Sequence, residues 1–92
     1  MVKRYREEVE VLETRPDPRS VGSAAPARFR WRGREHRVAD VLGHWREDAG
    51  WWVGGGLRVP QRDLWRLEVA GGARVVELVR EGERWRLDRV WD

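Results

Sequence analysis

The sequence contains no cysteine, no asparagine and no isoleucine, and its 92 residues include a single methionine. The lack of cysteine excludes disulfides, thiolate catalysis and cysteine-ligated metal sites. No stretch approaches the roughly 20 apolar residues that a helix needs to cross a bilayer. No apolar segment follows the basic N-terminus, as a signal peptide would require. We therefore expect a cytoplasmic protein without a membrane segment.

Residues that could carry catalysis are equally scarce. The hydroxyl candidates Thr14, Ser20 and Ser23 fall in a Pro-containing segment, where no rigid scaffold would align them with a base. The two histidines, His36 and His44, do not occur in a recognised metal-binding spacing. The sequence therefore predicts a protein that is not an enzyme and has no cofactor and no metal site.

Tryptophan and arginine are abundant instead. A chain of this length forms one domain at most, and its seven Trp can supply much of a small core. We expect Trp31, Trp65 and Trp85 to lie in that core. The 19 Lys and Arg residues, of which only Lys3 is a lysine, outnumber the 16 acidic residues and give a net charge of +3.

Alternation of polar and apolar residues predicts strands along most of the chain. Residues 5–13 alternate around Val9 and Val11, as in a half-buried strand. The following segment is rich in Pro and small residues, which is typical of a linker. The pattern divides the chain into an N-terminal arm strand at 1–14, a linker at 15–27 and a folded body at 28–92. Such an arm could add to the sheet of the body, swap to a second copy or stay mobile in solution.

The body shows three further patterns. Residues 28–38 alternate on both sides of Gly33, which predicts a hairpin. Residues 37–46 fit a helical period as well as a bulged strand, and we favour the strand. Residues 63–91 contain two glycine turns and predict a three-stranded meander. The whole is an all-β fold, a small antiparallel curled sheet or SH3-like barrel of about 5–6 strands with an N-terminal arm strand, which by itself implies no function.

The predicted hairpin at 28–37 holds five Arg against one Glu. Because alternate side chains share one face of a strand, we expect Arg28, Arg30 and Arg32 to form a row, with the aromatic residues on the opposite face. Guanidinium groups suit bidentate phosphate binding. The alternative is a solvated strand face that neighbouring glutamates balance. The nucleic-acid interpretation assigns binding to Arg28, Arg30, Arg32, Arg34 and Arg37.

A second candidate contact is the pair Trp51 and Trp52. Adjacent residues on a strand point to opposite faces, so we expect one of the two indoles to be exposed, where it could stack on a base or anchor a partner. The alternative is packing over the end of the barrel. Gly54–Gly56 follows the pair without the Lys-Ser/Thr ending of a phosphate-binding loop, so we interpret it as a hinge.

Several strings rich in Trp and Arg mark the body. They are Phe29-Arg30-Trp31-Arg32-Gly33-Arg34-Glu35-His36-Arg37-Val38, Trp45-Arg46-Glu47, Trp51-Trp52, Arg62-Asp63-Leu64-Trp65-Arg66-Leu67 and Trp85-Arg86-Leu87-Asp88-Arg89-Val90-Trp91-Asp92. With them, residues 28–92 resemble a small domain of unknown function from actinobacteria and the Deinococcus-Thermus group. That domain is similar to the C-terminal tail of ImuB-type proteins, the Y-family-polymerase-like subunits of bacterial mutasomes. The resemblance implies a setting in DNA-damage tolerance and does not cover the arm or the linker.

Two hypotheses for function follow. The first is a non-catalytic binding module that contacts nucleic acid or a protein partner through the arginine hairpin and an exposed Trp, with DNA repair or translesion synthesis as the setting that the resemblance implies. The alternative is a structural self-association domain, in which the strand at 5–13 pairs with the sheet edge of a second copy and makes a homodimer without binding nucleic acid.

Overall fold

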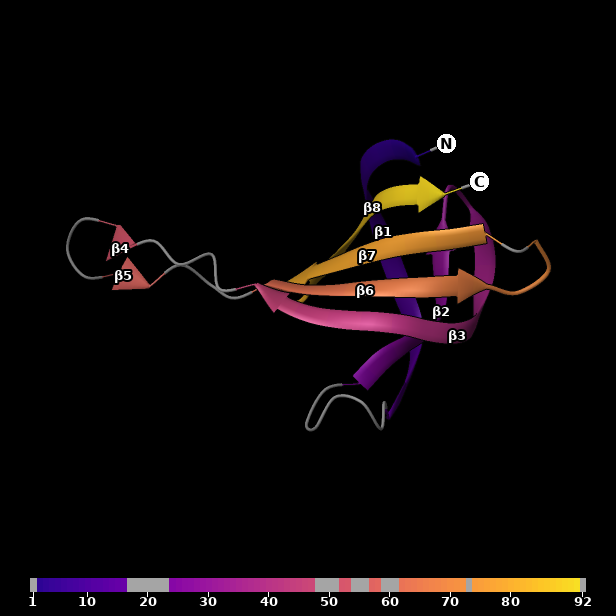
Figure 1. The fold of residues 1–92 in the computed structure, drawn as a ribbon, viewed down its shortest axis with the longest axis horizontal. Coiled ribbons are helices and arrows are strands. Elements are labelled where there is room, and N and C mark those ends of the chain that lie inside the picture. The colour runs from indigo at the N-terminus through magenta and orange to yellow at the C-terminus, as the bar shows by residue number, and fades with distance from the viewer. Residues whose placement is uncertain are drawn as a thin grey trace.

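The computed structural model spans residues 1–92 and describes residues 2–16, 24–47, 52–53, 57–58, 62–72 and 74–91. The strands are β1 (Val2–Pro16), β2 (Ala24–Trp31), β3 (Arg34–Glu47), β4 (Trp52–Val53), β5 (Leu57–Arg58), β6 (Arg62–Val69), β7 (Arg74–Glu81) and β8 (Arg84–Trp91). Six of them form a closed antiparallel barrel in the order β1-β2-β3-β6-β7-β8, and β4 and β5 form a separate two-stranded sheet (Figure 1). The prediction of an all-β barrel is confirmed. The described residues include no helix that could cross a membrane.

Strand β1 closes the barrel. Its first half pairs with β8 from Val2 to Val9, and its second half pairs with β2 from Glu10 to Pro16. A register shift before Glu7 places Arg6 at a φ of 51°, so the strand bends as it passes along the barrel wall. Because β1 hydrogen-bonds to a strand on each side, the predicted N-terminal strand is added to the sheet of the body, which is one of the placements that the sequence left open.

The predicted linker at 15–27 is longer than the connection between β1 and β2 in the structure. Strand β1 continues to Pro16, and β2 begins at Ala24. Ala25 and Pro26 are fully buried, because small and rigid side chains fit where β2 packs closely on the core. Residues 17–23 lie outside the described part of the chain. Composition indicated a linker here because Pro and Ala are poor strand signals, although both occupy strand positions in this barrel.

The barrel interior is apolar. Trp65, at 1% exposure, is the largest fully buried side chain, and Phe29 and Leu67 lie beside it in the core cluster. Trp31 and Trp85 are partly buried and pack against that cluster. The prediction that three Trp build the core is therefore confirmed for Trp65 and, with partial exposure, for the other two.

Strand β3 resolves the ambiguity at 37–46 in favour of a strand. Its pairing with β6 has register shifts between Val38 and Asp40 and between Val41 and Gly43. Each shift inserts an extra residue, so inward-facing residues recur at a spacing of three instead of two. This spacing explains why the sequence also resembled a helix. The meander of β6, β7 and β8 is as predicted.

Candidate nucleic-acid interface

The arginine hairpin is formed by β2 and β3. In the register, Arg28 lies opposite Arg37, and Arg30 lies opposite Glu35. The turn between the strands consists of Arg32 and Gly33, with φ angles of 52° and 74°. Positive φ at both central residues is the requirement of a two-residue type I′ hairpin turn. The prediction that Arg28, Arg30 and Arg32 form a row is therefore wrong for Arg32, because Arg32 belongs to the turn and not to the strand.

Arg32 instead fastens the turn to β1. Its Nη2 and Nε donate hydrogen bonds to the two carboxylate oxygens of Glu7, at 2.6 and 2.9 Å. Its guanidinium also lies 5.1 Å from the ring centroid of Tyr5 and 4.9 Å from that of Trp31. The hydrogen bond from Arg32 lowers the pKa of Glu7, and the same bond raises the pKa of Arg32. Arg32 therefore has a structural partner already.

Arg28 and Arg30 share one carboxylate. Glu35 lies 3.5 Å from Nη1 of Arg28 and accepts a hydrogen bond of 3.3 Å from Nη2 of Arg30. Glu13 on β1 lies 3.8 Å from Nε of Arg28, and that nitrogen has no hydrogen-bond partner among the residues that the structure describes. This part of the hairpin matches the alternative expectation of a face that glutamates balance.

Arg34 and Arg37 differ from their neighbours. Within the described residues, no carboxylate lies within 4.0 Å of either guanidinium. Arg37 also faces Arg28 directly across the strand pair, an arrangement in which like charges destabilise a sheet. Burial lowers the pKa of His36, and the positive charges of Arg74 and Arg34 lower it further. The hairpin therefore carries positive charge that the described part of the fold does not neutralise.

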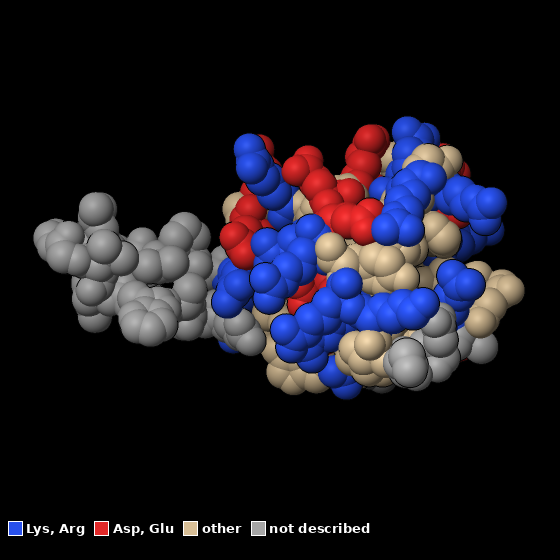
Figure 2. All heavy atoms as spheres, turned by 90° about the horizontal axis from the view of Figure 1, so that it is seen from above, with Lys and Arg blue, Asp and Glu red and all other residues tan. Residues whose placement is uncertain are grey.

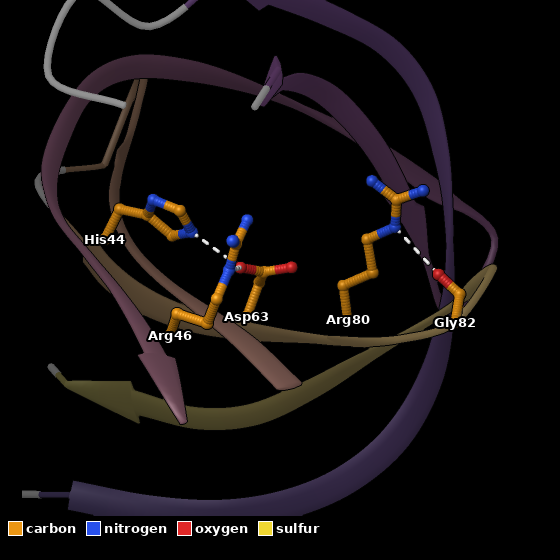
Figure 3. Close-up of polar contacts among 5 residues, drawn as sticks. All are labelled: His44, Arg46, Asp63, Arg80 and Gly82. Atoms are coloured by element: carbon orange, nitrogen blue, oxygen red, sulfur yellow. Dashed lines mark hydrogen bonds and ion pairs between the residues drawn. The ribbon is translucent and has the colours of Figure 1, made fainter. Parts of the chain in front are cut away.

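A different polar cluster lies at an end of the barrel, where β3 ends and β6 begins (Figure 3). Oδ1 of Asp63 lies 3.0 Å from Nε2 of His44 and accepts a hydrogen bond of 3.2 Å from Nε of Arg46. The His44 ring stacks on Trp65 at a centroid distance of 3.7 Å. Arg80, nearby on β7, donates from Nε to the carbonyl oxygen of Gly82 at 2.8 Å. In the part of the chain that the structure describes, no three His, Asp or Glu residues gather as a metal site would require.

The outer face of β6, β7 and β8 is also rich in arginine, but nearby carboxylates balance the positive charges. Arg62 and Arg86 both contact Glu81, at 3.6 and 3.3 Å, and Arg89 contacts Asp88 at 3.8 Å. These residues line an open hollow of about 410 Å³. Figure 2 shows basic and acidic side chains interspersed over the face that it views. Because carboxylates already contact these arginines, this surface is a weaker candidate for phosphate binding than the hairpin.

The aromatic half of the predicted site is only partly described. Trp51 lies outside the described residues, and Trp52 is described only as the first residue of β4, paired with Arg58. Trp45 on β3 is 46% exposed, and sequence reasoning missed it. The alternation along β3 could have indicated an outward position for Trp45, but the two register shifts hide the period.

The described residues define a small six-stranded antiparallel barrel with a basic hairpin on its surface. The chain belongs to the family described as Domain of unknown function (DUF6504), which matches residues 1–92. The match includes the N-terminal strand that the resemblance had left out, in agreement with the place of β1 in the barrel. No curated protein and no solved structure gives a significant match to the chain.

Proposed function

We propose that this protein is a non-catalytic binding module that holds nucleic acid by its phosphates on the β2–β3 hairpin. The observation that carries the proposal is that neither Arg34 nor Arg37 has a carboxylate within 4.0 Å in the described residues. Arg37 also lies opposite a second arginine, Arg28, in the register. A phosphate at Arg37 would give this guanidinium the charge-assisted hydrogen bonds that no described carboxylate supplies.

Carboxylate contacts of the other hairpin arginines reduce the number of residues that are available to bind phosphate. Arg32 is held by Glu7, and Arg30 by Glu35, so their charges are already balanced in the free protein. Arg28 likewise contacts Glu13 and Glu35. Arg34 and Arg37 can bind phosphate without losing a carboxylate contact in the described structure. Neutralising phosphates releases counterions, so the affinity should fall steeply as salt rises.

The resemblance to ImuB-type tails supports DNA-damage tolerance as the setting, and a protein partner there is part of this proposal. The self-association alternative has less support. It needs a free edge on β1, whereas β1 pairs with β2 on one side and β8 on the other. Pairing with a second copy through this strand would first require the barrel to open.

Binding of labelled single- and double-stranded DNA and RNA across a salt series tests the proposal. The double variant Arg34→Glu with Arg37→Glu should weaken binding and reduce the slope of log affinity against log salt by roughly 2, because two phosphate contacts are lost. A fluorescence anisotropy titration at each salt concentration measures both quantities.

The matched control reverses two cations elsewhere. Lys3 and Arg4 lie on β1 opposite β8, are exposed and have no carboxylate within 4.0 Å in the described residues. The variant Lys3→Glu with Arg4→Glu changes the net charge equally but should leave the salt slope close to that of the parent. If wild type binds no nucleic acid even at low salt, the proposal is wrong.

A further inference from the structure

Trp45 presents an indole on the outer face of the barrel. It lies opposite Leu64 in the register, while its neighbour His44 points inward and stacks on Trp65. Trp45 is 46% exposed, whereas the core residue Trp65 is 1% exposed. The indole therefore offers part of a large, flat apolar surface to a ligand.

The indole lies along the strand, over Gly43. A Cβ added at Gly43 would stand 2.5 Å from Cη2 of Trp45 and 3.0 Å from its Cζ2. Only glycine leaves room for the ring in this position. The ring is thereby held against the sheet surface, with less freedom than a side chain that extends into solvent.

A guanidinium completes the arrangement. The Arg66 Cζ on β6 lies 5.0 Å from the ring centroid of Trp45 and 4.8 Å from that of Trp91 on β8. Both distances are within the range of cation–π contacts. Glu77, only 5% exposed, also holds Arg66 through an ion pair of 3.6 Å. Trp45, Arg66 and Trp91, which we call the indole array, therefore come from three strands and contact one another through the Arg66 guanidinium.

We infer that the indole array is a stacking site for a base of single-stranded nucleic acid, an inference that rests on the proposed function. Flat aromatic and guanidinium groups both stack on bases, with little dependence on sequence. Bases are available for stacking in a single strand but are already stacked in a duplex.

The array lies on the same strand as the proposed phosphate site. Arg37 and Trp45 are both on β3, eight residues apart, which corresponds to about 26 Å of extended strand. Asp40 and Glu68 lie opposite each other between these two points. Their charges disfavour phosphates there, so we expect phosphate contacts at the hairpin and base contacts at Trp45. One single strand of a few nucleotides could reach both.

The test compares Trp45→Ala and Trp45→Phe in binding to a single-stranded oligothymidylate and to a duplex of the same length. Loss of one stacked base should weaken single-strand binding by about 5- to 150-fold in Trp45→Ala. Duplex binding and the salt slope should stay unchanged, and Trp45→Phe should restore most of the affinity. Leu42→Ala is the control, because Leu42 is a 40% exposed apolar residue on the same strand and has no aromatic ring to stack on a base.

A second measurement needs no variant. An oligonucleotide that carries 5-iodouridine, photo-crosslinked to the wild-type chain, should give its main adduct at Trp45 or Trp91. Adducts confined to other residues would overturn the inference.

The outcomes separate the two proposals. If wild type binds no nucleic acid, the proposed function fails and the inference fails with it. If wild type binds, Arg34→Glu with Arg37→Glu weakens binding and Trp45→Ala does not, the stacking site alone is wrong. Equal loss of single-strand and duplex binding in Trp45→Ala would also contradict the stacking site.

Discussion

At the scale of single residues, His36 is a residue of the basic hairpin whose ring contacts the barrel core. Its ring stacks on Phe29 at a centroid distance of 5.2 Å and lies 6.2 Å from that of Trp31. Burial lowers its pKa below the ordinary value of 6.5, and the charges of Arg74 and Arg34 lower it further. The folded protein therefore binds a proton at His36 less readily than the unfolded chain does.

This difference predicts a dependence of stability on pH. His36 contributes its full stability above pH 6.5, and that stability is lost as the pH falls through the lower pKa of the folded state. Glu7, whose pKa is lowered from 4.5, loses its contribution only at lower pH, so it does not account for a change between pH 5 and 7. Urea unfolding across this range should show a free energy of unfolding that decreases toward pH 5.

The control for this prediction is His36→Gln, which cannot titrate. Its free energy of unfolding should change less between pH 7 and pH 5 than that of wild type, whatever its absolute value. Parallel curves for the two proteins would show that His36 does not cause the dependence.

At the scale of elements, the hairpin turn is the feature most sensitive to backbone geometry. Gly33 has a φ of 74°, and a Cβ there would meet no atom within 4 Å, so any cost of a side chain is conformational and not steric. Gly33→Ala should destabilise the protein by about 1–2 kcal/mol, the cost of a left-handed conformation for an L-residue. Thermal unfolding should show a decrease in Tm of roughly 4–8 °C per kcal/mol.

Gly72→Ala is the matched control. Gly72 lies in the turn between β6 and β7 without a positive φ, and a Cβ there would make one contact, at 4.0 Å with Cγ of Arg74. This substitution should change stability by less than about 0.5 kcal/mol. A Gly33→Ala protein as stable as the Gly72→Ala protein would contradict the type I′ interpretation of the hairpin turn.

Sequence patterns predicted the strands better than they predicted which strands and side chains pair with one another. Strict alternation around Gly33 and in the β6–β8 meander gave the correct strands, because each of these segments pairs in a nearly regular register. The N-terminal strand was predicted, but its position was left open, since nothing local in residues 2–16 shows that both edges of the strand are paired. Arg32 was misplaced because an Arg at positive φ is unusual in a turn, and only its contact with Glu7 explains it. Partners of the hairpin arginines come from β1, which no local pattern reveals.

At the scale of the whole molecule, closure of the barrel depends on β1. This strand covers the edges of both β2 and β8, and it brings Val9 into the core and Tyr5 and Val11 against it. Without β1, the rest of the chain would expose two strand edges and part of the apolar interior. A small barrel has little stability in reserve for such a loss.

Removal of residues 1–16 should therefore unfold the protein. We expect the 17–92 fragment to lose its cooperative thermal transition and the dispersed amide signals of a folded protein in an NMR spectrum. Addition of a peptide of residues 1–16 should restore both, because the strand supplies the missing pairing from outside the chain. A fragment that unfolds cooperatively by itself would show that the body at 28–92 folds without the strand.

The same dependence can be measured without deleting any residue. A protease site inserted between residues 16 and 24 and then cleaved leaves β1 attached only by its hydrogen bonds and side-chain packing. The cleaved protein should stay folded, but its Tm should now rise with protein concentration, since folding has become an association of two chains. The uncleaved insertion protein should show no such concentration dependence. A Tm that does not depend on concentration after cleavage would mean that β1 contributes little to the closed barrel.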